Sequence, residues 1–202
     1  TNSLRNTGKD PQNNWRESIN FRWLILEMGN TQLRKYEEYA YVLDCKTRAK
    51  STTVRGRTGI IVVALGEERL TLLEILGIEN STFDVGERIY IGKEGRTKVQ
   101  SVLGKMDYVK ISGSAKDEIP TVVESIVTKN EAKFVDYINN AQPLTPRIHA
   151  LELIPGIGKT YLNVIIKERE KGPFESFVDI EKRVGLKEPI KHLSQRIIEE
   201  IS

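Results

Sequence analysis

Hydrophobic residues in the first half of this chain follow a period of two. Residues 39–43 alternate between larger and smaller apolar side chains, a continuous apolar run follows at 60–65, and a mainly apolar segment follows at 70–76. Alternation indicates a half-buried strand, and a short apolar run bounded by glycine indicates a buried one. The pattern predicts three strands, the second and third joined by a hairpin at Gly66-Glu67-Glu68.

Further strands complete this region. Residues 83–87 predict a turn into a strand at 88–92, and residues 99–111 supply at least one more strand. Short strands with glycines at the corners are typical of a small closed barrel. An OB-like barrel, the five-stranded Greek-key form, fits residues 36–111, and an SH3-like barrel is the alternative.

The hydrophobic spacing becomes helical from residue 112 onward. Ser114 is the expected N-cap of a helix with an apolar stripe from 119 to 127, and Pro120 is expected near its first turn. Five further helices are predicted, at 131–140, 144–153, 159–171, 176–184 and 190–201.

The fold class that follows is α+β, a small N-terminal β-barrel followed by an all-α domain. The predicted divisions are an N-terminal extension at 1–35, the barrel at 36–111, linker helices at 112–142 and a helical domain at 143–202. The last boundary lies at Gln142-Pro143-Leu144-Thr145-Pro146, because two prolines interrupt the helical pattern there.

The first 35 residues differ from the rest in pattern and charge. Residues 1–14 are polar without apolar periodicity, which predicts a flexible arm, whereas residues 19–26 fit a helix or a strand. Six basic and three acidic residues give this segment a net +3. If Met28 is the initiator, residues 1–27 come from an upstream start or an artificial extension, and a non-functional extension is favoured.

A glycine-rich turn, Ile154-Pro155-Gly156-Ile157-Gly158-Lys159, separates two of the predicted helices. Proline cannot continue a helix and glycine tolerates positive φ, so one helix ends and the next begins within this segment. The first N–H groups of the second helix lack backbone acceptors, and the helix dipole adds partial positive charge beside them. The turn therefore predicts a phosphate site formed by Gly156, Ile157, Gly158, Lys159 and Thr160.

The turn and the residues after it resemble the helix-hairpin-helix family of nucleic-acid-binding modules. Ile157, Leu162 and Ile165 are apolar where the motif is apolar, and residues 172–184 repeat its turn and third helix. The resemblance implies that the amides of the hairpin hold a backbone phosphate. Residues 185–189 occupy the place of a second hairpin, but they lack Gly-x-Gly and are expected to have only a structural role.

A second candidate contact with nucleic acid lies between the first two strands. In OB barrels this loop and the face of strands 2 and 3 form the usual oligonucleotide groove, where cations contact phosphates and aromatic rings stack on bases. Twelve positions here contain five basic residues and no acidic one, namely Lys46, Arg48, Lys50, Arg55 and Arg57. The candidate rings are Tyr39, Tyr41, Phe83, Tyr90 and Tyr108.

Charge in the helical domain is nearly balanced, because ten basic residues face nine acidic ones in residues 143–202. Affinity for nucleic acid from this domain alone is therefore expected to be modest. The basic residues expected to form a fringe around it are Arg169, Lys171, Lys182, Arg183, Lys187, Lys191 and Arg196.

Composition limits the remaining possibilities. The 202 residues carry a net charge of +3, which permits nucleic-acid binding without requiring it. A single cysteine, Cys45, excludes an internal disulfide, and two histidines argue against a histidine metal site, so no metal or cofactor is expected. Apolar runs are shorter than the ~20 residues of a membrane span and no signal core is present, which favours a cytoplasmic protein without membrane contact.

The order of segments resembles an archaeal family of unknown function that combines an OB-like barrel with a helix-hairpin-helix domain. The resemblance covers about residues 36–202 and rests on the strand segments 37–44 and 86–92, the linker helices and the hairpin at 153–158. It implies a nucleic-acid-binding protein, with RNA as the favoured ligand, and no assigned activity.

We therefore expect a non-catalytic protein that binds single-stranded or structured RNA or DNA, with RNA favoured. A protein-interaction scaffold of a nucleic-acid-processing or ribosomal assembly is the main alternative. A metal-dependent nuclease is less favoured, because Asp44, Glu67, Glu68 and Asp107 show no site spacing and Cys45 lacks a histidine partner.

Overall fold

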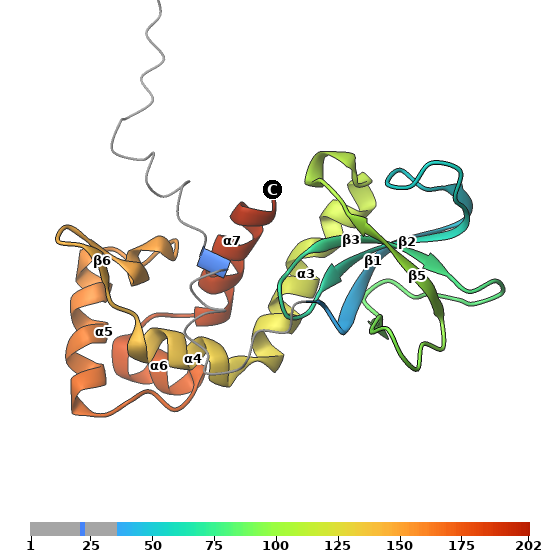
Figure 1. Ribbon diagram of the computed structural model, residues 1–202. Coiled ribbons are helices and arrows are strands. Elements are labelled where there is room, and N and C mark those ends of the chain that lie inside the picture. Colours follow the sequence, from blue (N-terminus) through green and yellow to red (C-terminus); the bar gives the residue numbers. More distant parts are fainter. Residues whose placement is uncertain (1–20, 23–35) are drawn as a thin grey trace, which may run out of the picture.

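The computed structural model describes residues 21–22 and 36–202, which form a sheet part and a helical part with helix α3 between them (Figure 1). The strands of the main sheet are β1 (Tyr39–Lys50), β2 (Thr58–Gly66), β3 (Leu72–Gly77), β4 (Arg88–Tyr90) and β5 (Val99–Lys105). The α-helices of the described part are α3 (Gly113–Lys129), α4 (Glu131–Asn140), α5 (Lys159–Lys171), α6 (Phe177–Val184) and α7 (Pro189–Ile201). The mixed α+β class is confirmed.

The five strands are antiparallel neighbours in the order β4-β1-β2-β3-β5. Within the described residues β4 and β5 are the two edges and do not pair with each other. The sheet is therefore a curled half-barrel with an open seam. The predicted five strands are present, whereas the expected closure of the barrel is not completed by strand pairing.

Strand β1 is long and contains two bulges. Its register against β2 shifts between Val42 and Asp44 and again between Lys46 and Ala49, where Arg48 has a φ of 54°. A bulge bends a strand and increases its twist. The bends allow β1 to pair with β4 at its start and with β2 along its length.

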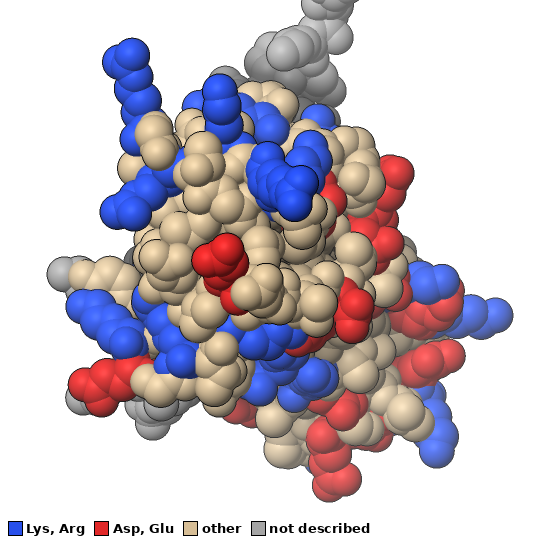
Figure 2. Space-filling view, turned by 90° about the vertical axis from the view of Figure 1, so that its right-hand side faces the viewer, with Lys and Arg blue, Asp and Glu red and all other residues tan. Residues whose placement is uncertain are grey.

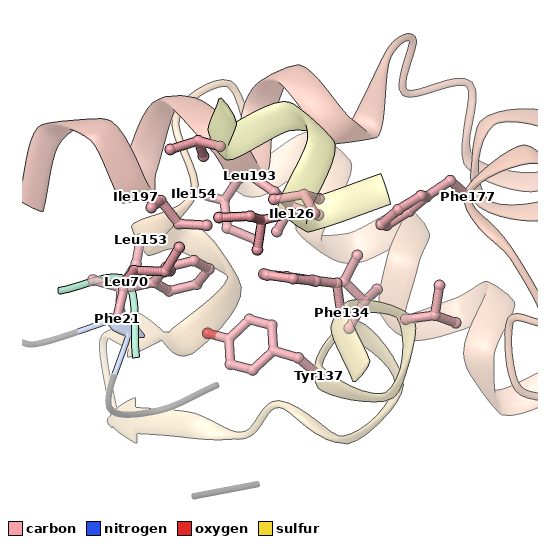
Figure 3. Close-up of a cluster of buried hydrophobic side chains, with 14 of the residues drawn as sticks. Phe21, Leu70, Ile126, Phe134, Tyr137, Leu153, Ile154, Phe177, Leu193 and Ile197 are labelled. Carbon is pink, nitrogen blue, oxygen red and sulfur yellow. The ribbon is translucent and has the colours of Figure 1, made fainter. Parts of the chain in front are cut away.

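The two faces of the sheet belong to different hydrophobic clusters. Ala40 and Val42 lie inside the curl, whereas Tyr41 and Leu43, alternating with them, join the larger cluster that includes α3 and the C-terminal helices. Figure 3 shows part of this larger cluster, where side chains of α3, α4 and α7 meet. The segment 112–142 thus packs against both parts of the molecule.

Helix α3 begins at a different serine from the expected one. Ser112 is the N-cap, and its Oγ accepts a hydrogen bond from Ala115 N and donates one to Asp44 Oδ2 at 2.7 Å. The expectation of a cap at Ser114 is wrong, because Ser112 can also reach the carboxylate on β1. Pro120 lies in the helix interior rather than near the first turn and is exposed to solvent.

Four of the other predicted helices are confirmed, since α4 and α5 have the expected bounds and α6 and α7 differ by one residue at their starts. The helix expected at 144–153 is wrong. That segment forms β6 (Pro143–Thr145), β7 (Ile148–His149) and the 3-10 helix η3 (Ala150–Leu153). Pro146 disfavours helical backbone at the residue before it, and Thr145 Oγ1 accepts hydrogen bonds from the N–H groups of the turn that follows.

Two residues of the N-terminal segment pack onto the helical part. The Phe21 side chain is fully buried and meets the Tyr137 ring edge-on, with centroids 5.1 Å apart. Arg22 forms an ion pair with Glu200 and donates to Leu70 O at 2.8 Å. This part of the expected extension therefore contributes to the core, while the predicted arm at 1–14 and Met28 lie outside the described residues.

Candidate nucleic-acid interface

The turn before α5 is held in place by buried apolar residues and by one histidine. Ile154 and Ile157 are buried on either side of it, and Gly156 has a φ of 88°, where only glycine is unstrained. His192 Nδ1 lies 2.9 Å from Pro155 O, and a Cβ on Gly156 would meet this nitrogen at 2.5 Å. His192 of α7 therefore helps to fix the shape of the turn.

The N-terminus of α5 is open to solvent. Gly158 is the N-cap and no side chain caps the first turn. A Cβ added to Gly158 would meet nothing within 4 Å, and its φ of −91° is ordinary. Thr160 is exposed. The first turn of α5 therefore has no side-chain cap in the described structure, and anion binding at its backbone N–H groups stays a prediction.

Lys159 does not add a free charge to this position. Its Nζ forms an ion pair with Glu152 Oε1 at 2.9 Å and donates to Arg147 O at 3.0 Å. Burial disfavours the ionised form of Glu152, but the hydrogen bond from His149 N and the charge of Lys159 outweigh it, so the pKa of this carboxyl is lowered. The sequence places Lys159 correctly at the turn but does not show its partner seven residues earlier.

His149 forms the other half of a capping box on η3. Its Nδ1 accepts from Leu151 N at 3.1 Å, so the neutral ring carries its proton on Nε2. Within the described structure that Nε2 is buried without a hydrogen-bond partner. Burial and the neighbouring charge of Arg169 both lower the pKa of His149, which keeps the ring neutral.

The five predicted cations occupy the β1–β2 hairpin, here defined as residues 46–57. Lys46, Arg48 and Lys50 lie on β1 itself, and only Arg55 and Arg57 lie in the connecting loop, so the expectation of a single basic loop is corrected. All five are exposed, and in the described part of the chain none forms an ion pair. Figure 2 shows the side of the molecule that lies at the right in Figure 1. Basic side chains gather over its upper part, at the height of the hairpin in Figure 1.

A buried carboxylate on β3 anchors this hairpin. Glu74 is fully buried and accepts hydrogen bonds from Thr52 N at 3.0 Å, Thr52 Oγ1 at 2.6 Å and Thr53 Oγ1 at 2.8 Å. Burial disfavours its ionised form, but the hydrogen bonds from Ser51, Thr52 and Thr53 outweigh it and lower the pKa of Glu74. Sequence reasoning missed this residue, although a charged residue within an apolar run is a recognisable signal.

The two candidate regions do not form one surface. The hairpin projects from the sheet part, and the turn before α5 lies at the far side of the helical part (Figure 1). A single ligand that contacted both regions would have to extend along the length of the molecule.

None of the five aromatic rings expected to stack on bases is fully exposed. Tyr41 is buried, and the Arg88 guanidinium lies 3.5 Å from the centre of the Tyr39 ring, which also packs edge-on against Tyr90. The partly buried rings of Phe83 and Tyr108 lie beneath lysine side chains. Among the aromatic residues that the structure describes, the exposed ring is that of Tyr36, which sequence reasoning did not select.

Most of the expected basic fringe is used within the helical part. Arg196 is buried and paired with Glu200, and Arg169 donates to Ile138 O and Ala141 O at the end of α4. Arg183 pairs with Glu168 and Asp179. Among the seven, Lys182 and Lys187 are exposed and form no ion pair with a described residue. The fringe is therefore mainly structural.

The carboxylates considered for catalysis have other partners or stand apart. Glu67 pairs with Arg88, and Asp44 accepts from Cys45 N and from Ser112. Cys45 is half-buried on β1, and burial together with the charge of Asp44 raises the pKa of its thiol. In residues 21–22 and 36–202, no group of three or more His, Cys, Asp or Glu side chains could hold a metal ion.

Comparison with known proteins places the chain in a family. Residues 36–202 match the family described as "Protein of unknown function (DUF655)". The chain belongs to this family. It is 39% identical over 169 residues to the "Uncharacterized protein MJ0038" of Methanocaldococcus jannaschii, covering 84% of this chain and 76% of that protein.

A crystal structure exists for another member of DUF655. Af1531 from Archaeoglobus fulgidus is 40% identical to this chain and superposes with a TM-score of 0.74, covering 82% of this chain and 93% of that one. Both similar proteins are archaeal, so the expected relation to an archaeal family of unknown function is confirmed. No helix among the described residues of the present protein has the length and apolar character of a membrane span.

Proposed function

We propose that this member of DUF655 is a non-catalytic nucleic-acid-binding protein, with RNA favoured over DNA, that acts in the cytoplasm. The proposal rests on the β1–β2 hairpin. Five of its twelve residues are exposed cations, and in the described structure none of the five has an ion-pair partner. The whole chain has a net charge of only +3, so this is a local concentration of charge. Such a cluster binds phosphates by releasing counterions from the nucleic acid.

The anchoring of the hairpin supports the same proposal. Hydrogen bonds from Thr52 and Thr53 to Glu74 fix the loop that carries Arg55 and Arg57. A loop that is already ordered loses less conformational entropy when it binds. The carboxylate that provides this order accepts hydrogen bonds from Thr52 and Thr53, which are uncharged donors, so it leaves the arginines free for phosphates.

The N-terminus of α5 supplies a second contact in this proposal. A phosphate can approach Gly158 closely because no Cβ occupies the space before it. Accessible N–H groups and the helix dipole then hold the phosphate oxygen. The turn before α5 acts as a helix-hairpin-helix motif in which η3 takes the place of the first helix, and the curled sheet acts as an OB-like barrel.

Contact through cations and backbone amides reads phosphates and shape more than base sequence. We therefore expect similar affinity for unrelated sequences and a strong dependence on salt. Five phosphate contacts on a single strand correspond to a slope of about −3.5 for the logarithm of the association constant against the logarithm of salt concentration.

Fluorescence anisotropy with labelled oligonucleotides of about 20 nucleotides tests the proposal. Matched RNA and DNA, single and double stranded, are titrated at several salt concentrations between about 50 and 200 mM. We expect binding that weakens steeply with salt and is tighter for RNA. Absence of binding to all four ligands near 50 mM salt would refute the proposed function.

A further inference from the structure

A groove of about 1100 Å³ lies at the open seam of the half-barrel. Its walls include Leu73 on β3 and Val102 on β5, together with Ile91 directly after β4. These residues belong to the hydrophobic cluster inside the curl or pack against it. Because β4 and β5 do not pair in the described structure, the apolar interior of the sheet is accessible through this groove.

An exposed aromatic ring stands at the rim of the groove. Tyr36 is 61% exposed, and Lys93 Nζ lies 5.1 Å from its ring centre. An exposed tyrosine beside an apolar wall offers a flat face for a planar ligand, and a nearby ammonium favours a ligand that also carries negative charge.

Charges at the groove favour an anionic ligand. Arg69, Lys93 and Lys105 are exposed at its rim, where the carboxylates are the exposed Glu94 and the half-buried Glu38. The Glu37 carboxylate is buried and accepts from the N–H groups of Glu68 and Arg69 at 2.8 Å each. That hydrogen bonding turns Glu37 toward the β2–β3 turn instead of toward a ligand.

One wall of the groove is rigid. Arg96 donates to Gly92 O at 2.6 Å, to Ile91 O at 3.0 Å and to Gln100 O at 3.3 Å. The guanidinium therefore ties the segment after β4 to β5 across the seam. A site with a fixed wall is already formed before its ligand arrives.

From these observations we infer that the groove binds a base of single-stranded nucleic acid, stacked on Tyr36, with the adjoining phosphates at Lys93 and Lys105. The inference rests on the proposed function and adds a base-binding site to the phosphate contacts. A planar base fits the combination of aromatic face, apolar wall and cationic rim. An extended peptide would instead form main-chain hydrogen bonds with the open edge of β5, and it would not require the Tyr36 ring.

Tyr36 precedes β1 by three residues, whereas Arg55 and Arg57 follow the end of this strand in the connecting loop. Thr53 of that loop lies against Gly104, next to Lys105 at the rim of the groove, so the length of a ligand does not separate the two sites. Variants separate them instead: Tyr36→Ala removes the ring at the groove, and Arg55→Glu/Arg57→Glu changes the charge of the loop.

The test uses oligonucleotides that contain 2-aminopurine, a base whose fluorescence is quenched by stacking. We expect quenching with the wild-type protein and with Tyr36→Phe, which keeps the ring. We expect Tyr36→Ala to abolish the quenching and to weaken binding of an oligonucleotide of about 20 nucleotides about 10-fold. Thermal unfolding is measured for Tyr36→Ala and Tyr36→Phe as well, so that a loss of binding is interpreted only in variants that remain folded.

A tetranucleotide titrated into isotope-labelled protein provides the second measurement. We expect NMR shifts at Tyr36, Lys93 and Lys105 in the wild type and in Arg55→Glu/Arg57→Glu alike. Unchanged affinity and quenching in Tyr36→Ala, with tetranucleotide shifts absent from the groove, would overturn the inference and favour a peptide. The proposed function would still stand if the longer oligonucleotide bound through the hairpin, and would itself fail if that oligonucleotide did not bind.

Discussion

The β1–β2 hairpin and the turn before α5 use a carboxylate in opposite ways. Under the hairpin, Glu74 accepts hydrogen bonds from the backbone amide of Thr52 and from the hydroxyl groups of Thr52 and Thr53, and the nearby arginines form no ion pair in the described structure. Beside the turn, Glu152 accepts from Lys159 and neutralises it. The difference teaches that the donors of a carboxylate decide whether neighbouring cations remain available to a ligand.

The largest effect is expected from Glu74→Ala. This change leaves Thr52 N and two hydroxyl groups without their acceptor and creates a small cavity, so the free energy of unfolding should fall by about 3 kcal/mol. Urea denaturation measures this loss. Binding of single-stranded oligonucleotides should also weaken, because the arginines would no longer be held on an ordered loop.

Glu74→Gln is the matched control, since it retains the size of the side chain and one acceptor oxygen. It should lose less stability than Glu74→Ala and retain more of the binding. If both variants unfold and bind like the wild type, the hairpin does not depend on this carboxylate.

Acid should weaken the anchor under the hairpin. The pKa of Glu74 is lowered in the folded protein from its usual value of 4.5, so the ionised form stabilises the fold above that pH. This stabilisation should fade as pH falls below 4.5 through the lowered pKa. The free energies of unfolding of wild type and Glu74→Gln, measured as a function of pH, should therefore converge toward low pH. A difference that stays constant with pH would contradict this role.

Two glycines in the turn before α5 should respond differently to alanine. Gly156→Ala forces a positive φ and a contact with His192, so we expect a loss of about 2 kcal/mol in the free energy of unfolding. Gly158→Ala meets open space at an ordinary φ and should cost less than about 1 kcal/mol.

Gly158→Ala, the variant expected to lose less stability, is the one expected to lose affinity for a direct reason. The new methyl group of Gly158→Ala would occupy the space through which a phosphate approaches the amides of α5, so affinity should fall several-fold in a protein that remains folded. Anisotropy measured beside thermal unfolding separates the two effects. Unchanged affinity in Gly158→Ala would remove α5 from the binding surface.

The smallest effect is expected from Glu152→Gln. The amide oxygen can still accept from His149 N, so η3 keeps its cap, while Lys159 loses the charge that neutralises it. Affinity for single-stranded oligonucleotides should rise about two-fold, since one more cation becomes available. A decrease in affinity would show that the ion pair positions Lys159 for binding.

Helix bounds were predictable wherever local signals agreed. Gly158 and Gly172 flank α5, and the bounds expected for that helix are the observed ones. The segment 144–153 was not predictable from its apolar residues, because Pro146 and the Thr145 side chain favour a turn over a helix. Apolar spacing alone does not report such competition.

The candidate site was predictable in its residues but not in their partners. Clusters such as Arg55 and Arg57, or Gly156 and Gly158, are visible in the sequence because their members are neighbours in the chain. Glu74 lies about 20 residues from the loop that it anchors, and Tyr36 joins Lys105 only through the curl of the sheet. Contacts of this kind depend on strand register, which is a property of the whole fold.

The salt dependence of single-stranded RNA binding tests most directly whether the hairpin carries the affinity. Arg55→Glu/Arg57→Glu is compared with Lys182→Glu/Lys187→Glu, which changes net charge equally at exposed positions of the helical part. We predict that the hairpin variant binds at least about 10-fold more weakly, with a salt slope reduced by about 1.5, whereas the control keeps the wild-type slope. Equal losses in both variants would contradict the account, because they would show that net charge rather than the hairpin determines binding.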